Sequence, residues 1–271
     1  MPYDIIILGG QSNAEGNGLG PTDRPFILDE RILMMRDGGK YGYEQQEDGS
    51  MKYFVTEPYT YVTEIAKERN DGQNNYGMFA LTFAKKYIEA GLLEDGRKLL
   101  IINGTSGGTG FAGKQWGIGN VLHERLIKMI NEAKKDENDR FVAFLWHQGE
   151  HDAFENAEAS AEKRREIYRA DLTATVNAIR NETGENRLPF IAAEFVSEWK
   201  DKNTVACDAV IAATNDVCEK LGNGKVVMAR DLKSNNQTVG NGDDIHFCRD
   251  ALVTLGERYF DAYCEIKGLN K

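Results

Sequence analysis

Short apolar runs alternate along the chain with longer segments of helical period. The apolar runs have the length of β-strands and end in glycine or polar residues. They fall at Ile5–Leu8, Ile32–Met35, Leu99–Ile102, Phe141–Trp146, Phe190–Phe195 and Val226–Met228. The helical segments fall at Met78–Ala90, Val121–Lys134, Ala157–Ile179, Val205–Leu221 and Ala251–Ile266. This alternation predicts a three-layer α/β/α sandwich around a mostly parallel central sheet.

The segment Asp37–Gln73 follows neither period and is rich in glycine, tyrosine and glutamine. We expect a long irregular loop there. Loops in this position carry specificity in α/β enzymes, and tyrosines suit sugar faces. The alternative is a solvated insertion whose aromatic side chains pack locally.

The first apolar run stops at Gly9 and Gly10, and Ser12 follows in the turn. A serine hydroxyl becomes a good nucleophile only when a base removes its proton. Of the four histidines, His246 lies three residues after Asp243. This pattern predicts Ser12 as nucleophile, His246 as base and Asp243 as the group that orients the imidazole. On turn chemistry alone, Ser12 could instead be a helix N-cap or a loop hydroxyl.

Two further polar turns follow predicted strands. Asn103–Phe111 is rich in glycine and threonine, and His147–Asp152 contains two histidines and two acids. The carboxyl ends of parallel strands open on one edge of a sheet. We therefore expect both turns to converge with Ser12 at that edge.

Four blocks carry a family resemblance: Gly10–Asn13, Gly107–Thr109, Trp146–Asp152 and Asp243–His246. Together they resemble the blocks of SGNH hydrolases, in family order and across nearly the whole chain. They are most similar to the branch of sialate O-acetylesterases and acetylxylan esterases. The resemblance implies a flavodoxin-like sandwich and a serine esterase that removes O-acetyl groups from carbohydrates through an acyl-enzyme. It implies no metal and no organic cofactor.

Ester hydrolysis passes through an oxyanion, and one donor aimed at it is worth roughly 3 to 4 kcal/mol. The backbone N–H groups of Ser12 and Gly107 suit this role. The resemblance adds the side chain of Gln148, which stands before Gly149 in the form that the acetylesterase branch uses. Candidates for supporting roles or substrate contacts are Gln11, Asn13, Glu150 and Trp116, the last as a residue lining the pocket.

The role of Glu150 stays open between a second acid near His246, a substrate contact and a carboxylate that fixes its loop. Asp152 reads as structural. The segment from His147 to His151 also satisfies the H-x-x-E-H pattern of zinc hydrolases, with Glu150 between the histidines. That chemistry needs both histidines on one helix, whereas Gly149 and the preceding apolar run favour a strand. A further alternative is a non-catalytic carbohydrate-binding protein on the same fold.

Length and charge complete the prediction. The 271 residues fit a single SGNH-type domain over 1–271. The net charge of −10 argues against nucleic acid and anionic membranes as partners and favours a neutral substrate. The resemblance implies that this substrate is a small-molecule or oligosaccharide acetyl ester. No signal peptide or membrane span is visible, so we expect a cytoplasmic protein, although a secreted chain trimmed of its leader would read the same.

The cysteines show no CxxC pairing, and we expect free buried thiols at Cys207, Cys218, Cys248 and Cys264. The sequence indicates neither the oligomeric state nor the particular acetylated sugar.

Overall fold

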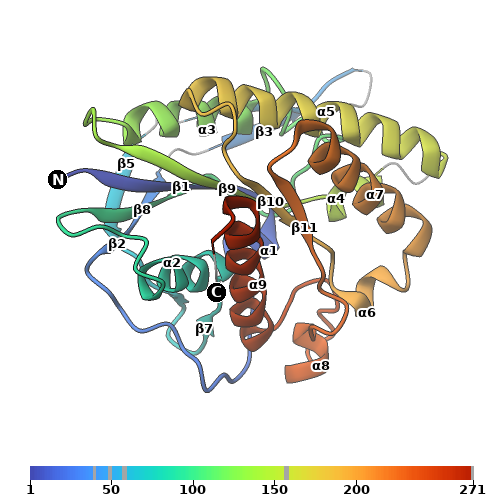
Figure 1. The fold of residues 1–271 in the computed structure, drawn as a ribbon. Helices are drawn as coiled ribbons and strands as arrows, with labels where there is room; N and C mark the ends of the chain where they lie inside the picture. The colour runs from blue at the N-terminus through green and yellow to red at the C-terminus, as the bar shows by residue number, and fades with distance from the viewer. Residues whose placement is uncertain (39–40, 48–50, 57–59, 156–158, 270–271) are drawn as a thin grey trace.

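Seven strands form the central sheet of the computed structural model, which describes residues 1–38, 41–47, 51–56, 60–155 and 159–269. In spatial order they are β11 (Gly224–Val227), β10 (Phe190–Ala193), β9 (Arg140–His147), β1 (Tyr3–Gly10), β8 (Lys98–Asn103), β2 (Ile32–Asp37) and β5 (Tyr61–Ile65). Neighbouring strands are parallel, except that β5 runs antiparallel to β2. The predicted α/β fold with a mostly parallel sheet is confirmed (Figure 1).

The strand order reverses at β1, which lies in the middle of the sheet. Ile7 pairs with Ile102 of β8 on one side and with Phe144 of β9 on the other. After β1 the chain forms β2 and β5 on one side, returns to place β8 between β2 and β1, and then adds β9, β10 and β11 in order on the other side. Crevices at such reversals, outside the carboxyl ends of the strands, are where open α/β sheets bind ligands.

Side chains of β1 alternate between two hydrophobic cores. Ile6 and Leu8 enter one core, and Ile5 and Ile7 enter the other, all with 0% exposure. This is the period of two that a strand buried on both faces requires. Burying each of these side chains contributes about 1.5–3 kcal/mol, so the central strand anchors both layers.

Helices cover both faces of the sheet. The first core receives side chains from α2 (Phe79–Glu89) and α9 (Arg249–Lys267). The second core receives side chains from α3 (Val121–Ala133), α5 (Ala161–Thr183) and α7 (Thr204–Leu221). Figure 1 shows α3 and α5 above the sheet and α2 and α9 below it. The predicted three layers are thus confirmed, although the predicted helix start at Ala157 lies outside the described residues.

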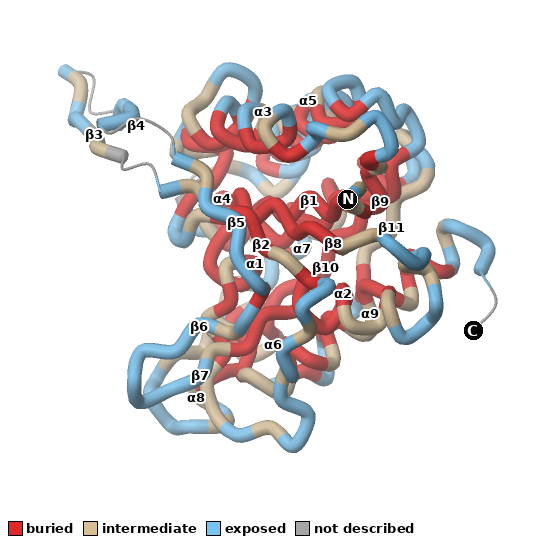
Figure 2. The backbone as a smooth tube through the Cα atoms, turned by 90° about the vertical axis from the view of Figure 1, so that its left-hand side faces the viewer, coloured by how far each residue is buried: buried red, intermediate tan, exposed pale blue. Residues whose placement is uncertain are grey.

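The expectation of an irregular loop over 37–73 is wrong. The described part of this segment contains the antiparallel hairpin of β3 (Tyr41–Gln45) and β4 (Met51–Val55) and the edge strand β5. A short pair, β6 (Arg69–Asn70) with β7 (Asn75–Tyr76), follows. The hairpin projects away from the sandwich (Figure 2). Most residues of β5 are exposed, so the strand shows no alternation of apolar and polar positions that the sequence could reveal.

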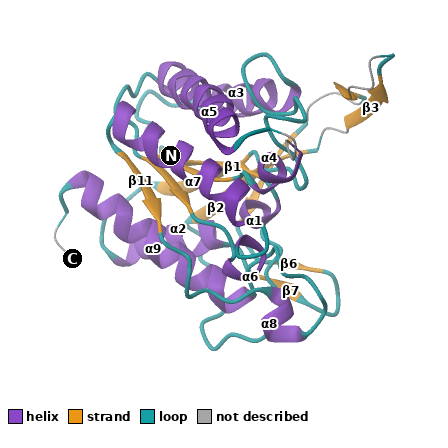
Figure 3. Cartoon of the chain, turned by 90° about the vertical axis from the view of Figure 1, so that its right-hand side faces the viewer, coloured by secondary structure: helices purple, strands orange, loops and turns teal. Residues whose placement is uncertain are grey.

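Four short helices complete the described chain: α1 (Ser12–Glu15), α4 (Glu150–Glu155), α6 (Ser197–Lys200) and α8 (Asn235–Val239). α1 follows β1, α4 follows β9, and a hydrogen bond of 2.8 Å from Asn13 to Glu150 joins the two helices. Figure 3 shows both near the label of β1. All four cysteines are buried and none forms a disulfide. Within the described ranges, no helix has the length and apolar character needed to cross a membrane.

Candidate active site

The turn after β1 positions Ser12 at the first residue of α1. Gly10 has φ +124°, and a Cβ on it would lie 2.1 Å from the carbonyl oxygen of His147. Only glycine fits there, because L side chains rarely adopt this φ and the neighbouring backbone occupies the space. The Gln11 N–H donates to that same oxygen at 2.9 Å, so the turn stays fastened to β9. Ser12 is 8% exposed.

Ser12, His246 and Asp243 form one hydrogen-bonded chain. His246 Nε2 lies 2.8 Å from Ser12 Oγ. Its Nδ1 lies 2.9 Å from both Asp243 Oδ1 and Oδ2. A carboxylate accepts only, so it selects the tautomer with a proton on Nδ1 and leaves Nε2 free to accept the serine proton. The residues have the arrangement of a nucleophile, a base and an orienting acid.

Asn235 holds the Asp243 carboxylate in place, and the sequence did not single out Asn235 as a site residue. Its Nδ2 donates to Asp243 Oδ2 at 2.8 Å, and its backbone N–H donates to the His246 carbonyl at 2.8 Å. Asn235 is fully buried. Burial raises the pKa of Asp243, but the hydrogen bonds from Asn235 and His246 outweigh it and hold that pKa below its usual range. The only signal in the sequence was the capping box of Ser234 and Gln237, which marks the start of α8.

The Gly107 turn lies against the nucleophile. A Cβ on Gly107 would be 3.6 Å from Ser12 Cβ and 3.0 Å from Glu15 Oε2. Neither the Ser12 N–H nor the Gly107 N–H donates to another residue in the described part of the chain. The turn is fixed by the Ser106 N–H, which donates to Gly10 O at 3.0 Å. Two main-chain donors therefore remain available beside Ser12 Oγ.

Gln148 lies behind this turn with its amide nitrogen already engaged. Nε2 is 2.6 Å from Asp152 Oδ2, 3.1 Å from Thr109 O and 3.2 Å from Gln11 Oε1. The amide has two N–H groups for these three acceptors. Gln148 is 4% exposed. Its side chain therefore braces the turns of Gln11 and Thr109, and in this arrangement no N–H of Gln148 is left for an oxyanion.

Asp152 fastens a second turn. Its Oδ1 accepts from the Ala112 N–H at 2.8 Å, and its Oδ2 accepts from the Phe111 N–H at 3.2 Å. Burial raises the pKa of Asp152, and the bonds from Gln148 and these amides oppose that rise only in part. These contacts agree with the structural role expected for this acid.

The expectation that Trp116 lines the pocket is not met. The turn folds back through a hydrogen bond from Trp116 N to Gly110 O at 3.2 Å, which buries the indole completely. Its Nε1 donates to Thr109 Oγ1 at 3.0 Å, and its ring lies 5.0 Å from that of Trp146. Trp116 thus supports the Gly107–Thr109 turn from inside the core.

The histidines of the H-x-x-E-H pattern do not share a helix. His147 is the last residue of β9, Gly149 has φ +139°, and α4 begins at Glu150. The spacing of four therefore does not place His147 and His151 one helical turn apart. Among the described residues, no group of three or more His, Cys, Asp and Glu side chains is arranged to hold a metal ion.

Glu150 and Asn13 contact each other beside Ser12 and the turn that contains His246. Glu150 Oε1 accepts from Asn13 Nδ2 at 2.8 Å and lies 3.4 Å from His147 Nε2. Both Glu150 and Asn13 are 1% exposed, so neither meets bulk solvent or presents a face to an open site.

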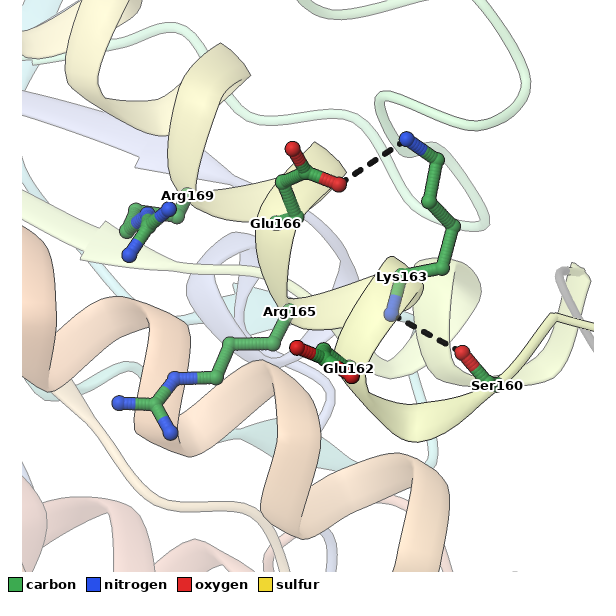
Figure 4. Close-up of a pocket in the computed structure, with 6 residues that line it drawn as sticks. All are labelled: Ser160, Glu162, Lys163, Arg165, Glu166 and Arg169. Carbon is green, nitrogen blue, oxygen red and sulfur yellow. Dashed lines mark hydrogen bonds and ion pairs between the residues drawn. The ribbon is translucent and has the colours of Figure 1, made fainter.

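A separate surface hollow of about 550 Å³ lies along the first turns of α5 (Figure 4). Its charged side chains are largely paired: Lys163 Nζ with Glu166 at 3.0 Å, and Arg165 with Asp216 at 2.6 Å. It contains no histidine, and its Ser160 is the N-cap of α5. Ser12, the Gly107 turn and His246 all lie elsewhere, with Ser12 after β1, Gly107 after β8 and His246 Nε2 at 2.8 Å from Ser12 Oγ.

The three-layer α/β/α sandwich and the hydrogen-bonded chain of Ser12, His246 and Asp243 are together the arrangement of an SGNH-type hydrolase. The sequence model of the family described as "Carbohydrate esterase, sialic acid-specific acetylesterase" matches residues 2–265. The chain belongs to this family.

Individual relatives agree with this assignment. A protein of Arabidopsis thaliana named "probable carbohydrate esterase" is 28% identical over 160 residues, which are 58% of this chain and 52% of that protein. The match thus spans about half the length of this curated relative.

Three solved structures show the same fold. NanS superposes with a TM-score of 0.72 at 18% identity over 98% of each chain. A structure from Arabidopsis thaliana gives 0.69 at 22% identity, over 98% of this chain and 99% of that one. The carbohydrate acetylesterase XAC1771 from Xanthomonas citri gives 0.62 at 17% identity, over 97% of this chain and 56% of that one.

Proposed function

We propose that this chain is a serine esterase that removes O-acetyl groups from carbohydrates. The observation that carries the proposal is the hydrogen-bonded chain from Ser12 Oγ through His246 to Asp243, with spacings of 2.8 Å and 2.9 Å. A protein that only binds sugars needs none of these three groups. We also propose that residues 1–271 form a single hydrolase domain, because one sheet separates both hydrophobic cores.

The reaction has two halves. Ser12 Oγ attacks the acetyl carbonyl while His246 Nε2 takes the hydroxyl proton. The tetrahedral intermediate collapses, the bond to the sugar oxygen breaks, and His246 returns the proton to the leaving alcohol. A water molecule then attacks the acetyl-serine with His246 as base, which releases acetate and restores Ser12.

The negative oxygen of each tetrahedral intermediate needs donors that are already in place. We assign this role to the backbone N–H groups of Ser12 and Gly107, because both lie beside Ser12 Oγ without another described partner. One such donor is worth roughly 3 to 4 kcal/mol of transition-state stabilisation. Gln148 joins them only if its amide leaves Thr109 O or Gln11 Oε1.

The substrate class follows from the family and from charge. The chain belongs to a family of carbohydrate esterases, and its relative from Xanthomonas citri is named a carbohydrate acetylesterase. The net charge of −10 disfavours polyanionic partners such as nucleic acid. We therefore propose an acetylated mono- or oligosaccharide of the xylo-oligosaccharide or sialic acid type.

Covalent labelling tests the nucleophile directly. A sulfonyl fluoride or organophosphate should add one label per chain, on Ser12, and abolish hydrolysis of p-nitrophenyl acetate and acetylated sugars. Ser12→Ala should take no label and lose turnover while remaining folded. Near-normal turnover by Ser12→Ala would refute the proposal.

Two further arms separate the alternatives. Sugar binding without turnover by the unmodified protein would favour the binding protein. Loss of activity on chelation, restored by zinc, would favour the zinc hydrolase.

A further inference from the structure

Asn13 joins the nucleophile turn to the main chain on both sides of His246. Its Nδ2 donates to Ile245 O at 3.1 Å, and its Oδ1 accepts from the Phe247 N–H at 3.1 Å. The side chain of one residue thus grips the peptide groups before and after the base. Because Asn13 follows Ser12 directly, these two hydrogen bonds fix the main chain of His246 relative to Ser12.

The grip matters because the base lies in a segment without regular structure. Residues 241–246 form neither helix nor strand. His246 has 23% of its side chain exposed, so packing alone holds it loosely. Hydrogen bonds from Asn13 and Asn235 to the main chain around His246 therefore add to the restraint that Asp243 places on the imidazole ring.

Glu150 restrains the Asn13 amide in the orientation that the Ile245 carbonyl and the Phe247 N–H also require. A carboxylate offers acceptors only, so the group within 2.8 Å of Glu150 Oε1 must be Asn13 Nδ2 and not Oδ1. That choice leaves Oδ1 directed at the Phe247 N–H. Burial raises the pKa of Glu150, but His147 and the Asn13 amide more than offset it and hold that pKa below its usual range.

We propose that Glu150 and Asn13 are positioning residues that hold His246 in line with Ser12: Glu150 orients the Asn13 amide, and the amide fixes the main chain at Ile245 and Phe247. The proposal rests on the proposed function for its catalytic consequence. It assigns the two acids of the β9–α4 turn to different tasks. Asp152 serves the turn at Phe111 and Ala112, and Glu150 serves the base.

The first experiment measures the grip in the resting protein, without substrate. Amide hydrogen exchange at Phe247 should be faster in Glu150→Gln than in the unmodified protein, although Asn13 is still present, because a neutral amide holds Asn13 Nδ2 less tightly than the carboxylate does. Thr183→Val is the matched control. It removes a hydroxyl that is similarly buried, bonded to Ile179 O at 3.0 Å near the end of α5, and should leave Phe247 exchange unchanged.

The second experiment measures turnover per folded molecule. Asn13→Ala and Glu150→Gln should each lower kcat by about 10- to 100-fold with KM within threefold, by analogy with groups that orient metal ligands from behind. A role limited to stability would change the urea midpoint instead, as Thr183→Val should. The kcat of the double variant should equal that of the less active single variant, because both changes break the same connection.

An exchange of polarity gives the sharpest test. Asn13→Asp places a second carboxylate against Glu150 and should be nearly inactive. Adding Glu150→Gln supplies a donor to the new acid and should recover kcat by about tenfold, a partial recovery because the new acid cannot donate to Ile245 O.

Three results would overturn the proposal: unchanged Phe247 exchange in Glu150→Gln, additive losses in the Ala/Gln double variant, or no recovery in the exchanged pair. Failure of the proposed function reads differently. In that case Ser12→Ala keeps its turnover, while the exchange measurement still reports on the grip.

Discussion

Replacing the Asp243 carboxylate by an amide tests the proposed catalytic chain most severely. Asp243→Asn keeps the shape of the side chain but turns one of its two acceptors into a donor. The structure determines which end the donor takes. Asn235 Nδ2 already donates to Asp243 Oδ2 at 2.8 Å, so a second N–H at that position would face it unfavourably.

Asn235 cannot turn round to relieve this conflict. Its Oδ1 accepts from the Leu19 N–H at 2.7 Å, and its Nδ2 also donates to Asn17 O at 2.9 Å. The new amide nitrogen therefore takes the Oδ1 position, where it faces the His246 N–H at 3.3 Å and His246 Nδ1 at 2.9 Å. The Oδ2 position, also 2.9 Å from Nδ1, keeps an oxygen that already accepts from Asn235, so the imidazole is no longer held with its proton on Nδ1. In the opposite tautomer the proton is on Nε2, which points at Ser12. An imidazole in that tautomer cannot take the serine proton.

We expect Asp243→Asn to lower kcat by about 10⁴-fold, the loss that the same exchange causes in a serine protease triad. This corresponds to about 5 kcal/mol of transition-state stabilisation. The measurement is kcat/KM on one acetylated sugar, with folding checked by circular dichroism. Asp244→Asn is the matched control. That acid pairs with Lys202 at the surface at 2.6 Å, and its loss should change the rate less than twofold.

The ordering of variants decides whether this reasoning is correct. Glu150→Gln should lie between Asp243→Asn and the Asp244→Asn control, because Glu150 reaches His246 only through Asn13. If Asp243→Asn kept more than a tenth of the normal rate, the tautomer argument would fail. If Glu150→Gln were the more damaging change, the orienting acid would have to be reassigned to Glu150.

The remaining predictions concern cooperation, backbone strain and pH. Ser12→Ala and His246→Ala should each cost about as much as both together, and a double variant markedly slower than either single variant would contradict this. Gly149→Ala should lower the free energy of unfolding in urea by about 2–5 kcal/mol, because its φ is +139° and a Cβ would lie 2.6 Å from another side chain. Gly91→Ala, at φ +70° with nothing within 4 Å, should cost only about 1–2 kcal/mol, and equal losses would show that the crowding at Gly149 relaxes. The lowered pKa of Asp243 stabilises the folded state above the unfolded pKa of about 4, and this contribution is lost as pH falls through the folded pKa. The stability gap between the unmodified protein and Asp243→Asn should therefore shrink below about pH 4, and a gap that widened there would refute the assignment.

Much of the fold could be predicted because strands buried on both faces leave an apolar run that is easy to recognise. The run at Ile5–Leu8 became β1, with side chains in both cores. The approach of Ser12 to Gly107 and Gln148 was predictable for a related reason. Parallel strands all present their carboxyl ends at one edge, so polar turns after β1, β8 and β9 had to meet.

Features that depend on exposed strands or on contacts between distant side chains could not be predicted. The exposed strand β5 carries no alternating pattern, and the hairpin of β3 and β4 lies outside the sandwich. Asn235 reaches Asp243 only because the segment before α8 pairs with the His246 turn. Trp116 is an aromatic residue shortly after the Gly107–Thr109 block, but its own turn folds back and its side chain is buried. Local sequence composition predicts neither the position of Asn235 nor that of Trp116.

The residues on either side of Ser12 explain why the nucleophile turn and the β9–α4 turn act as one unit. Gln11 meets Gln148 at 3.2 Å, and Asn13 meets Glu150 at 2.8 Å. Gln11 and Asn13 lie two positions apart in the first turn, and Gln148 and Glu150 lie two positions apart in the second. A shift of one residue between the turns would therefore break both bonds at once. The first bond leads toward the Gly107 side of the site and the second toward His246. The two cross-links therefore fix the proposed oxyanion donors and the proposed base relative to the serine that lies between them, which is the preorganisation that ester hydrolysis requires.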